Sequence, residues 1–154
     1  MNDKSVFRDI ANEIKTLHNS ALVYVKNQDY DNAVYLYQKA LIISEKMHYY
    51  EGVAMSLFNI ANVLILINDV NKAIEYAAQS KNFFNKSGVD TTHCDNLLTC
   101  LARTLKANGI NHEKKGDFKE AIRSFTAALP YADCESRTAM KHEITLLKRF
   151  IDDR

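Results

Sequence analysis

The chain has 154 residues, and its 20 basic and 19 acidic side chains leave a formal net charge of +1 at pH 7. This balance provides no global field for attracting nucleic acid or an anionic membrane surface, so neither is expected as a partner. One Pro and four Gly in the whole chain favour long helices over short strands joined by tight turns.

No targeting or membrane segment is expected. The first five residues lack the basic stretch and apolar core of a secretory signal, and no run of about 18 apolar residues is present to cross a bilayer. A cytoplasmic location is therefore predicted.

The three cysteines are an odd number at spacings that match neither a disulfide framework nor a zinc site, so free thiols are predicted. His93 stands beside Cys94, but adjacent helical side chains point about 100° apart, and no second pair supplies the remaining ligands of structural zinc. No metal and no cofactor are expected. The cysteines are Cys94, Cys100 and Cys134.

Three segments of the chain align without gaps, at residues 17–41, 57–81 and 105–129. Each carries two small residues at the same two places, twelve positions apart. Paired small residues of this kind are expected where two helices cross closely. The pairs are Ala21 with Ala33, Ala61 with Ala73, and Gly109 with Ala121.

Each segment is predicted to form a helical hairpin, because a short polar break separates two stretches with apolar residues at helical spacing. Residues 5–13 are expected to extend the first helix backwards, and Tyr49 and Tyr50 to lie in the loop after the first hairpin. The hairpins are predicted at about residues 14–47, 54–87 and 102–134, with breaks at 27–29, 68–69 and 115–117.

A further helix is predicted at about residues 136–152, where apolar residues recur at spacings of three and four. A stack of helical repeats leaves an apolar face uncovered unless a helix with a polar outer side closes it, so this helix is expected to be a cap. Its apolar residues are Met140, Ile144, Leu147 and Ile151.

The second halves of the three segments read "DYDNAVYLYQKAL", "DVNKAIEYAAQSK" and "DFKEAIRSFTAAL". They resemble the tetratricopeptide repeat family, in which an Ala is followed four residues later by an aromatic residue. The family's first-helix tryptophan is a leucine in all three copies, and Pro130 precedes the place of the family's closing proline. The resemblance implies an all-α fold: a right-handed α-solenoid of three helical hairpins plus a C-terminal capping helix, about seven helices in a single domain over residues 1–154.

The repeat is longer than the usual period of about 34 residues. The interval from Ala33 to Ala73 is about 40 residues and the interval from Ala73 to Ala121 is about 48 residues, so longer helices are expected. The chain in this respect resembles the longer-period tetratricopeptide repeats of cell-polarity adaptors, kinesin light chains and bacterial response regulators.

The resemblance implies a protein-protein interaction module, an adaptor or scaffold that binds a peptide or helix of a partner in a concave groove. Two alternatives stay open: a self-associating structural protein, hence a homo-oligomer, and a regulatory domain that acts on an enzyme. The five histidines are scattered, and the expected helix phases bring together no Ser/His/Asp or Cys/His group. The chain is therefore not expected to be an enzyme.

In the family, the first helix of each repeat lines the groove. The corresponding positions of this chain place apolar residues in the middle of the groove and basic residues at its edges. A partner with apolar anchors and acidic flanks is predicted. Only Asn59 and Arg103 match the family's clamp for chaperone tails, so such a tail is not expected. The apolar members equally fit packing between repeats. The predicted groove residues are Lys15, His18, Asn19, Leu22, Met55, Phe58, Asn59, Asn62, Ile65, Arg103, Lys106 and Ile110.

Overall fold

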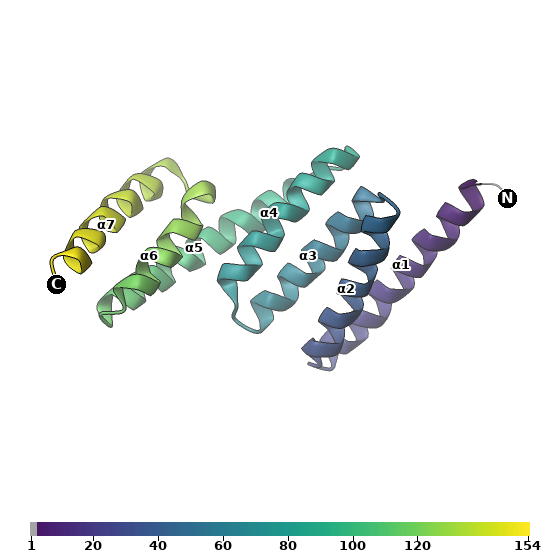
Figure 1. Cartoon of the computed structure of the whole chain (residues 1–154), viewed down its shortest axis with the longest axis horizontal. Helices are drawn as coiled ribbons and strands as arrows, with labels where there is room; N and C mark the ends of the chain where they lie inside the picture. Colours follow the sequence, from purple (N-terminus) through teal and green to yellow (C-terminus); the bar gives the residue numbers. More distant parts are fainter. Residues whose placement is uncertain (1–2) are drawn as a thin grey trace. The chain divides into compact units, whose positions relative to one another are not determined.

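Residues 3–154 are described by a computed structural model (Figure 1). Met1 and Asn2, which belong to the predicted domain, lie outside the described residues. Seven α-helices and one short 3-10 helix, η1, make up the described residues, and no strand occurs among them. This confirms the all-α prediction. The helices are α1 (Asp3–Lys26), α2 (Tyr30–Lys46), α3 (Tyr50–Leu66), α4 (Val70–Ser87), α5 (Thr92–Lys114), α6 (Phe118–Ala128), η1 (Leu129–Tyr131) and α7 (Cys134–Asp152).

One turn type joins α1 to α2, α2 to α3, α3 to α4 and α5 to α6. Each turn has three residues, and the middle one adopts a left-handed backbone conformation, with φ between 51° and 81°. The backbone N–H of the third turn residue then donates to a carbonyl five residues earlier, at 2.8–2.9 Å. This bond satisfies a carbonyl that the end of the helix would leave unpaired. The four middle residues are Gln28, His48, Asn68 and Gly116.

Helix length explains the long period. The helices α2 and α3 have 17 residues each, and with two three-residue turns they account for the whole interval between Ala33 and Ala73. The longer interval that follows contains α4 with 18 residues and α5 with 23. The predicted breaks at 27–29, 68–69 and 115–117 are confirmed as turns.

Two helices begin earlier than predicted. The helix α3 starts at Tyr50 and α5 at Thr92, because the residues that lengthen the period extend the N-terminal ends of these helices. The assignment of Tyr50 to a loop was therefore wrong, although Tyr49 does lie in the turn. At the start of α5, the Asp90 carboxylate accepts from the N–H and the hydroxyl of Thr92, both at 2.6 Å.

Two compact units make up the chain: unit 1 ends at Cys94, and unit 2 is Asp95–Arg154. In unit 1, α3 is the central helix, since it packs against α1, α2 and α4. Nine of its 17 residues are buried, and a hydrogen bond of 2.8 Å from the Ser80 hydroxyl to the Ala54 carbonyl ties α4 to it. The small residues predicted at the crossings of unit 1 are fully buried: Ala21, Ala33, Ala61 and Ala73.

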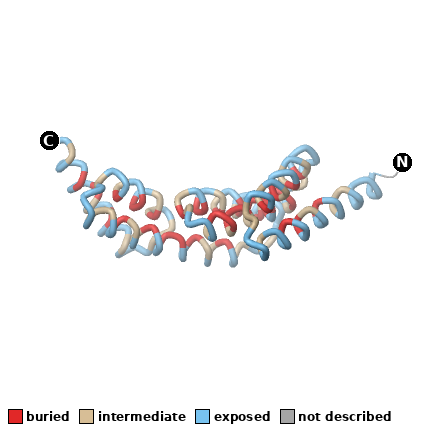
Figure 2. The backbone as a smooth tube through the Cα atoms, turned by 90° about the horizontal axis from the view of Figure 1, so that it is seen from below, coloured by how far each residue is buried: buried red, intermediate tan, exposed pale blue. Residues whose placement is uncertain are grey.

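In unit 2, the close approach of α5 and α6 depends on a glycine. A Cβ atom added to Gly109 would lie 2.5 Å from the ring of Phe125, which is itself buried. The small residue at this crossing therefore makes room for an aromatic ring of the partner helix. Along α7, buried positions recur on one side of the helix (Figure 2). They are Met140, Ile144 and Leu147, as predicted, while Ile151 is half-buried.

Within residues 3–154, no helix combines the length and the apolar character that crossing a bilayer requires.

Candidate functional site

The predicted groove residues divide between the two units. Nine of the twelve lie on α1 and α3 in unit 1, and Arg103, Lys106 and Ile110 lie on α5 in unit 2. The helices α1 and α3 are each the first helix of a hairpin, and they contact each other. In unit 2, α7 contributes the facing wall beside α5. Each unit thus has its own cleft.

The α1/α3 cleft contains a hollow of about 350 Å³. Lys15 and Asn19 line it from α1, and Met55 lines it from α3. All three are exposed. The hollow also reaches Ile14 and His18, which are buried. Four predicted groove residues therefore meet around one opening: Lys15, His18, Asn19 and Met55.

His18 forms the floor of this cleft through a contact that sequence reasoning missed. Its Nε2 lies 2.8 Å from the Ser56 hydroxyl oxygen, and its ring meets the Tyr37 ring edge-on with centroids 5.5 Å apart. The helix phases did not predict this serine and histidine to meet. The two residues are 38 positions apart, and no local motif marks them.

The pair does not form an activated nucleophile. The single proton of the Ser56 hydroxyl is donated to the Gly52 carbonyl at 2.9 Å, so Ser56 can only accept from Nε2–H of His18. Burial lowers the pKa of His18, which favours the neutral ring. A base that would activate Ser56 needs a free lone pair on that nitrogen, and Ser56 is fully buried. The contact holds α1 against α3.

The remaining groove residues of unit 1 differ in exposure. Leu22 is 46% exposed and Met55 41%, whereas Asn59, Asn62 and Ile65 are half-buried. Phe58 packs inward: its ring lies 5.1 Å from that of His93, and it contacts the buried cluster of Ala54, Phe84 and Cys94. The structure therefore gives Phe58 a packing role.

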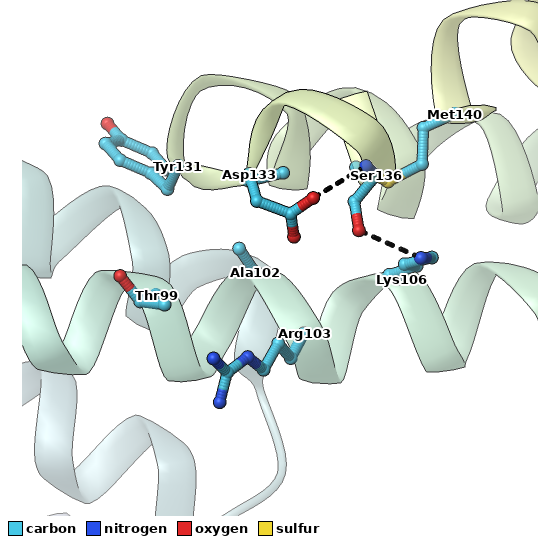
Figure 3. A pocket seen from close by; sticks show the side chains of 9 residues that line it. Thr99, Ala102, Arg103, Lys106, Tyr131, Asp133, Ser136 and Met140 are labelled. Atoms are coloured by element: carbon cyan, nitrogen blue, oxygen red, sulfur yellow. Dashed lines mark hydrogen bonds between the residues drawn. The ribbon is translucent and has the colours of Figure 1, made fainter. Parts of the chain in front are cut away.

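In unit 2, the α5/α7 cleft begins with a small pocket of about 60 Å³ (Figure 3). Arg103 and Lys106 line it from α5, and Asp133 and Ser136 line it from the turn and start of α7. The Lys106 ammonium donates to the Ser136 hydroxyl at 3.0 Å, and the Ser136 backbone N–H donates to Asp133 at 2.8 Å. The hydrogen bonds from Ser136, more than the nearby Lys106 charge, lower the pKa of Asp133.

A second hollow of about 150 Å³ continues along the same two helices. Lys106 and Met140 line both hollows, and Ile110, the third predicted groove residue of α5, lines the second. Glu113 and Glu143 face each other there. Partial burial, followed by the like charge of Glu143 and the hydrogen bond to it, raises the pKa of Glu113.

Neither cleft has the donor set of a metal centre. Over residues 3–154, no three histidine, cysteine, aspartate or glutamate side chains gather closely enough to hold an ion. Both clefts instead offer shape, apolar surface and a few charges, which is what recognition of another molecule uses.

Comparison with known proteins identifies the repeats. Residues 12–86 match the profile of the tetratricopeptide repeat family. No curated protein sequence matches the chain. Residues 12–86 are therefore tetratricopeptide repeats, and the resemblance derived from the sequence is confirmed there.

The solved structures that are similar to this chain include the following two. The N-terminal domain of stress-induced protein-1 from C. elegans is 15% identical, with a TM-score of 0.47, and the alignment covers 87% of this chain and 96% of that one. The nearly identical TPR-like repeats of a candidate kinesin light chain from Podospora anserina are 20% identical, with a TM-score of 0.47 and coverage of 87% and 64%.

Proposed function

We propose that this tetratricopeptide-repeat chain is an adaptor or scaffold that holds a segment of a partner protein, peptide or helix, in the α1/α3 cleft of unit 1. Repeats of this family are in general non-catalytic protein-interaction modules, and their stacked first helices present extended binding surfaces. A cytoplasmic adaptor would use the cleft to keep its partner in place.

The observation that carries the proposal is the open hollow of about 350 Å³ between α1 and α3. It is flanked by large apolar side chains that stay exposed, Met55 at 41% and Leu22 at 46%. Exposed apolar residues that gather beside a concavity mark interaction sites more often than isolated ones do. The hollow gives such a partner side chain a place to be buried.

Charge around the hollow defines the flanks of the partner. Lys15 lines the opening, and Lys26 ends the same helix. Both are exposed. No hydrogen bond or ion pair engages either ammonium among the described residues. A partner segment with one apolar anchor and acidic flanks fits this arrangement, because anchors in a pocket dominate affinity while rim charges steer the encounter.

A peptide-display selection on the full chain tests the proposal and works with an unidentified partner. Selected peptides are expected to share an apolar residue with acidic neighbours. Met55→Glu is expected to weaken their binding by about tenfold or more, which corresponds to about 1.4 kcal/mol, since it places a charge beside the apolar anchor of the partner and repels its acidic flanks. Lys15→Gln is expected mainly to slow association.

Ile42→Glu provides the matched control, because Ile42 is 51% exposed on α2 and does not line the hollow. Circular dichroism checks that each variant is folded. Peptides that bind the two glutamate variants equally well would refute the α1/α3 cleft as the site.

A further inference from the structure

We infer that a second surface of unit 1, between α2 and α4, binds an arginine side chain of a partner protein. The two helices bound a hollow of about 430 Å³, and no predicted groove residue lines it. It belongs to the second helices of the hairpins, whereas the α1/α3 cleft belongs to the first helices (Figure 1).

The sequence places one wall of this hollow on a single stripe of α4. Lys72, Tyr76, Gln79 and Phe83 follow one another at spacings of four, three and four residues, so they lie on one face of the helix. Glu75 stands at the edge of that stripe. The α4 wall therefore combines two aromatic rings with a carboxylate.

The opposite wall carries one leucine and a second carboxylate, and the floor is apolar. Leu41 and Glu45, one turn apart on α2, form the wall, and Leu57 of α3 closes the bottom. Leu57 is 4% exposed, so the floor is part of the core. An arginine side chain needs such a surface for its apolar stem while its charged end meets polar groups.

The charges of the hollow are unbalanced. Glu45 and Glu75 are exposed, and no ion pair to either is present among the described residues. The only cation on the lining is Lys72, whose ammonium lies 3.8 Å from the Asp69 carboxylate. A cationic partner would supply the missing charge, and complementarity of this kind favours its encounter and correct docking.

The aromatic rings favour a guanidinium over a simple ammonium. A planar guanidinium stacks on an aromatic face and donates in a fork to a carboxylate, whereas an ammonium is a compact, strongly hydrated point charge. Phe83 already attracts a cation of the protein itself, since the Lys86 ammonium lies 4.8 Å from its ring centre. Tyr76 is the ring that remains for stacking by the partner.

The test uses nuclear magnetic resonance titration of the full chain with Nα-acetyl-arginine methylamide, and with its lysine and citrulline counterparts. The arginine probe is expected to bind saturably and to shift the amide signals of residues 41–45 and 75–83. Citrulline, which keeps the shape but lacks the charge, is expected not to bind. Lysine is expected to bind several-fold more weakly.

Variants separate the site from general charge attraction. Glu45→Gln with Glu75→Gln is expected to weaken arginine binding by about tenfold or more, since each removes a charged hydrogen-bond acceptor. The control is Glu13→Gln with Glu135→Gln, which removes the same charge from exposed positions elsewhere, and it is expected to change binding less than twofold. Tyr76→Leu is expected to abolish the preference for arginine over lysine.

Several results would overturn the inference: equal binding of citrulline, equal loss in the two glutamate pairs, or signal shifts that avoid α2 and α4. A folded Tyr76→Leu variant that keeps its preference for arginine would exclude the stacked guanidinium. Met55→Glu is expected to leave arginine binding unchanged. The outcome at this surface is therefore independent of the outcome at the α1/α3 cleft.

Discussion

The α1/α3 cleft of unit 1 and the α5/α7 cleft of unit 2 both have the first helix of a hairpin as one wall, yet they are filled differently. In unit 1 the cleft keeps an opening of about 350 Å³ above a neutral His18–Ser56 hydrogen bond. In unit 2, Lys106, bonded to Ser136, and buried Met140 lie between hollows of about 60 and 150 Å³. Side chains, rather than helix type, thus decide whether such a cleft remains open.

The largest effect is expected from Met140→Ala. Met140 is 2% exposed and lines both hollows of the α5/α7 cleft, so its truncation would join them and lower the free energy of unfolding of unit 2 by about 2–5 kcal/mol. Amide hydrogen exchange in α5 and α7 measures this change. Leu146→Ala on the same helix, at a residue 43% exposed, is expected to stay within about 0.5 kcal/mol. Equal effects of the two would mean that Met140 does not hold the cleft closed.

A smaller effect is expected from Gly109→Ala. The new methyl group would lie 2.5 Å from the Phe125 ring, which is 2% exposed. The ring would have to shift out of its packed position towards the hollow of about 150 Å³ that it lines, so a loss of about 1–3 kcal/mol is expected. Gly52→Ala in unit 1 meets the ring of Tyr49 at the same 2.5 Å and the hydroxyl oxygen of buried Ser44 at 2.6 Å.

Tyr49 is half-buried and lies in a turn, so its ring can shift at lower cost than a core ring. The Ser44 hydroxyl can rotate away at the loss of its hydrogen bond to the Ala40 carbonyl, worth about 1 kcal/mol, and alanine favours the helix over glycine by about the same amount. Thermal unfolding of the two variants should therefore show the larger loss for Gly109→Ala. The reverse order would show that the turn before α3 is the more rigid of the two sites.

Acidification is expected to lower the free energy of unfolding of unit 1. Each tenfold difference in proton affinity between His18 in the unfolded and in the folded chain is worth about 1.4 kcal/mol. The folded-state pKa lies below the ordinary value of 6.5, so the unfolded chain binds the proton first, and stability is lost as the pH falls below about 6.5. Hydrogen exchange in α1 and α3 at pH 7.5 and 5.5 measures the loss. His18→Gln, which can still donate to Ser56, is expected to reduce this pH dependence. An unchanged dependence would assign it to other groups.

The smallest effect, of opposite sign, is expected at Glu113. Its pKa is raised above the ordinary value of 4.5, so the folded chain binds this proton more tightly than the unfolded chain. The resulting gain in the free energy of unfolding is present at low pH and is lost as the pH rises through the raised pKa. Glu113→Gln is expected to stabilise unit 2 at pH 7 by about a few tenths of a kcal/mol, because it removes one of two like charges. Melting curves at pH 4 and 7 test this: the gain should shrink at pH 4, and a constant gain would contradict it.

The helices were predictable because their signals are local or periodic. The alanines repeated at the same phase, such as Ala21 and Ala33, are fully buried, and polar breaks marked the turns. The helices α3 and α5 begin before the segments that the three copies share, so the similarity of the copies does not mark where these helices start. The turn before α3 ends in Tyr49, whereas the other three turns end in an aspartate, so this turn lacks the residue type that marks the start of a helix in the sequence.

The clefts were less predictable, because they depend on contacts between distant residues. Spacing placed Lys15, Asn19 and Met55 around one opening, but it did not show that His18 would pair with Ser56. Nor did it show that Phe58 would turn towards His93 and the core. Side-chain direction within a half-buried helix face is set by neighbours that a single sequence does not identify.

The three-residue turn has a consequence for how such a chain can grow. It joins the two helices of a hairpin and also joins α2 to α3, the first hairpin to the second. A duplication of residues 30–69 would therefore add one helix of each kind through junctions that already exist, and it would keep every later residue in phase. Array length along α1–α4 is thus a quantity that gene duplication, or a protein engineer, can change in steps of one whole repeat without inventing a new linker.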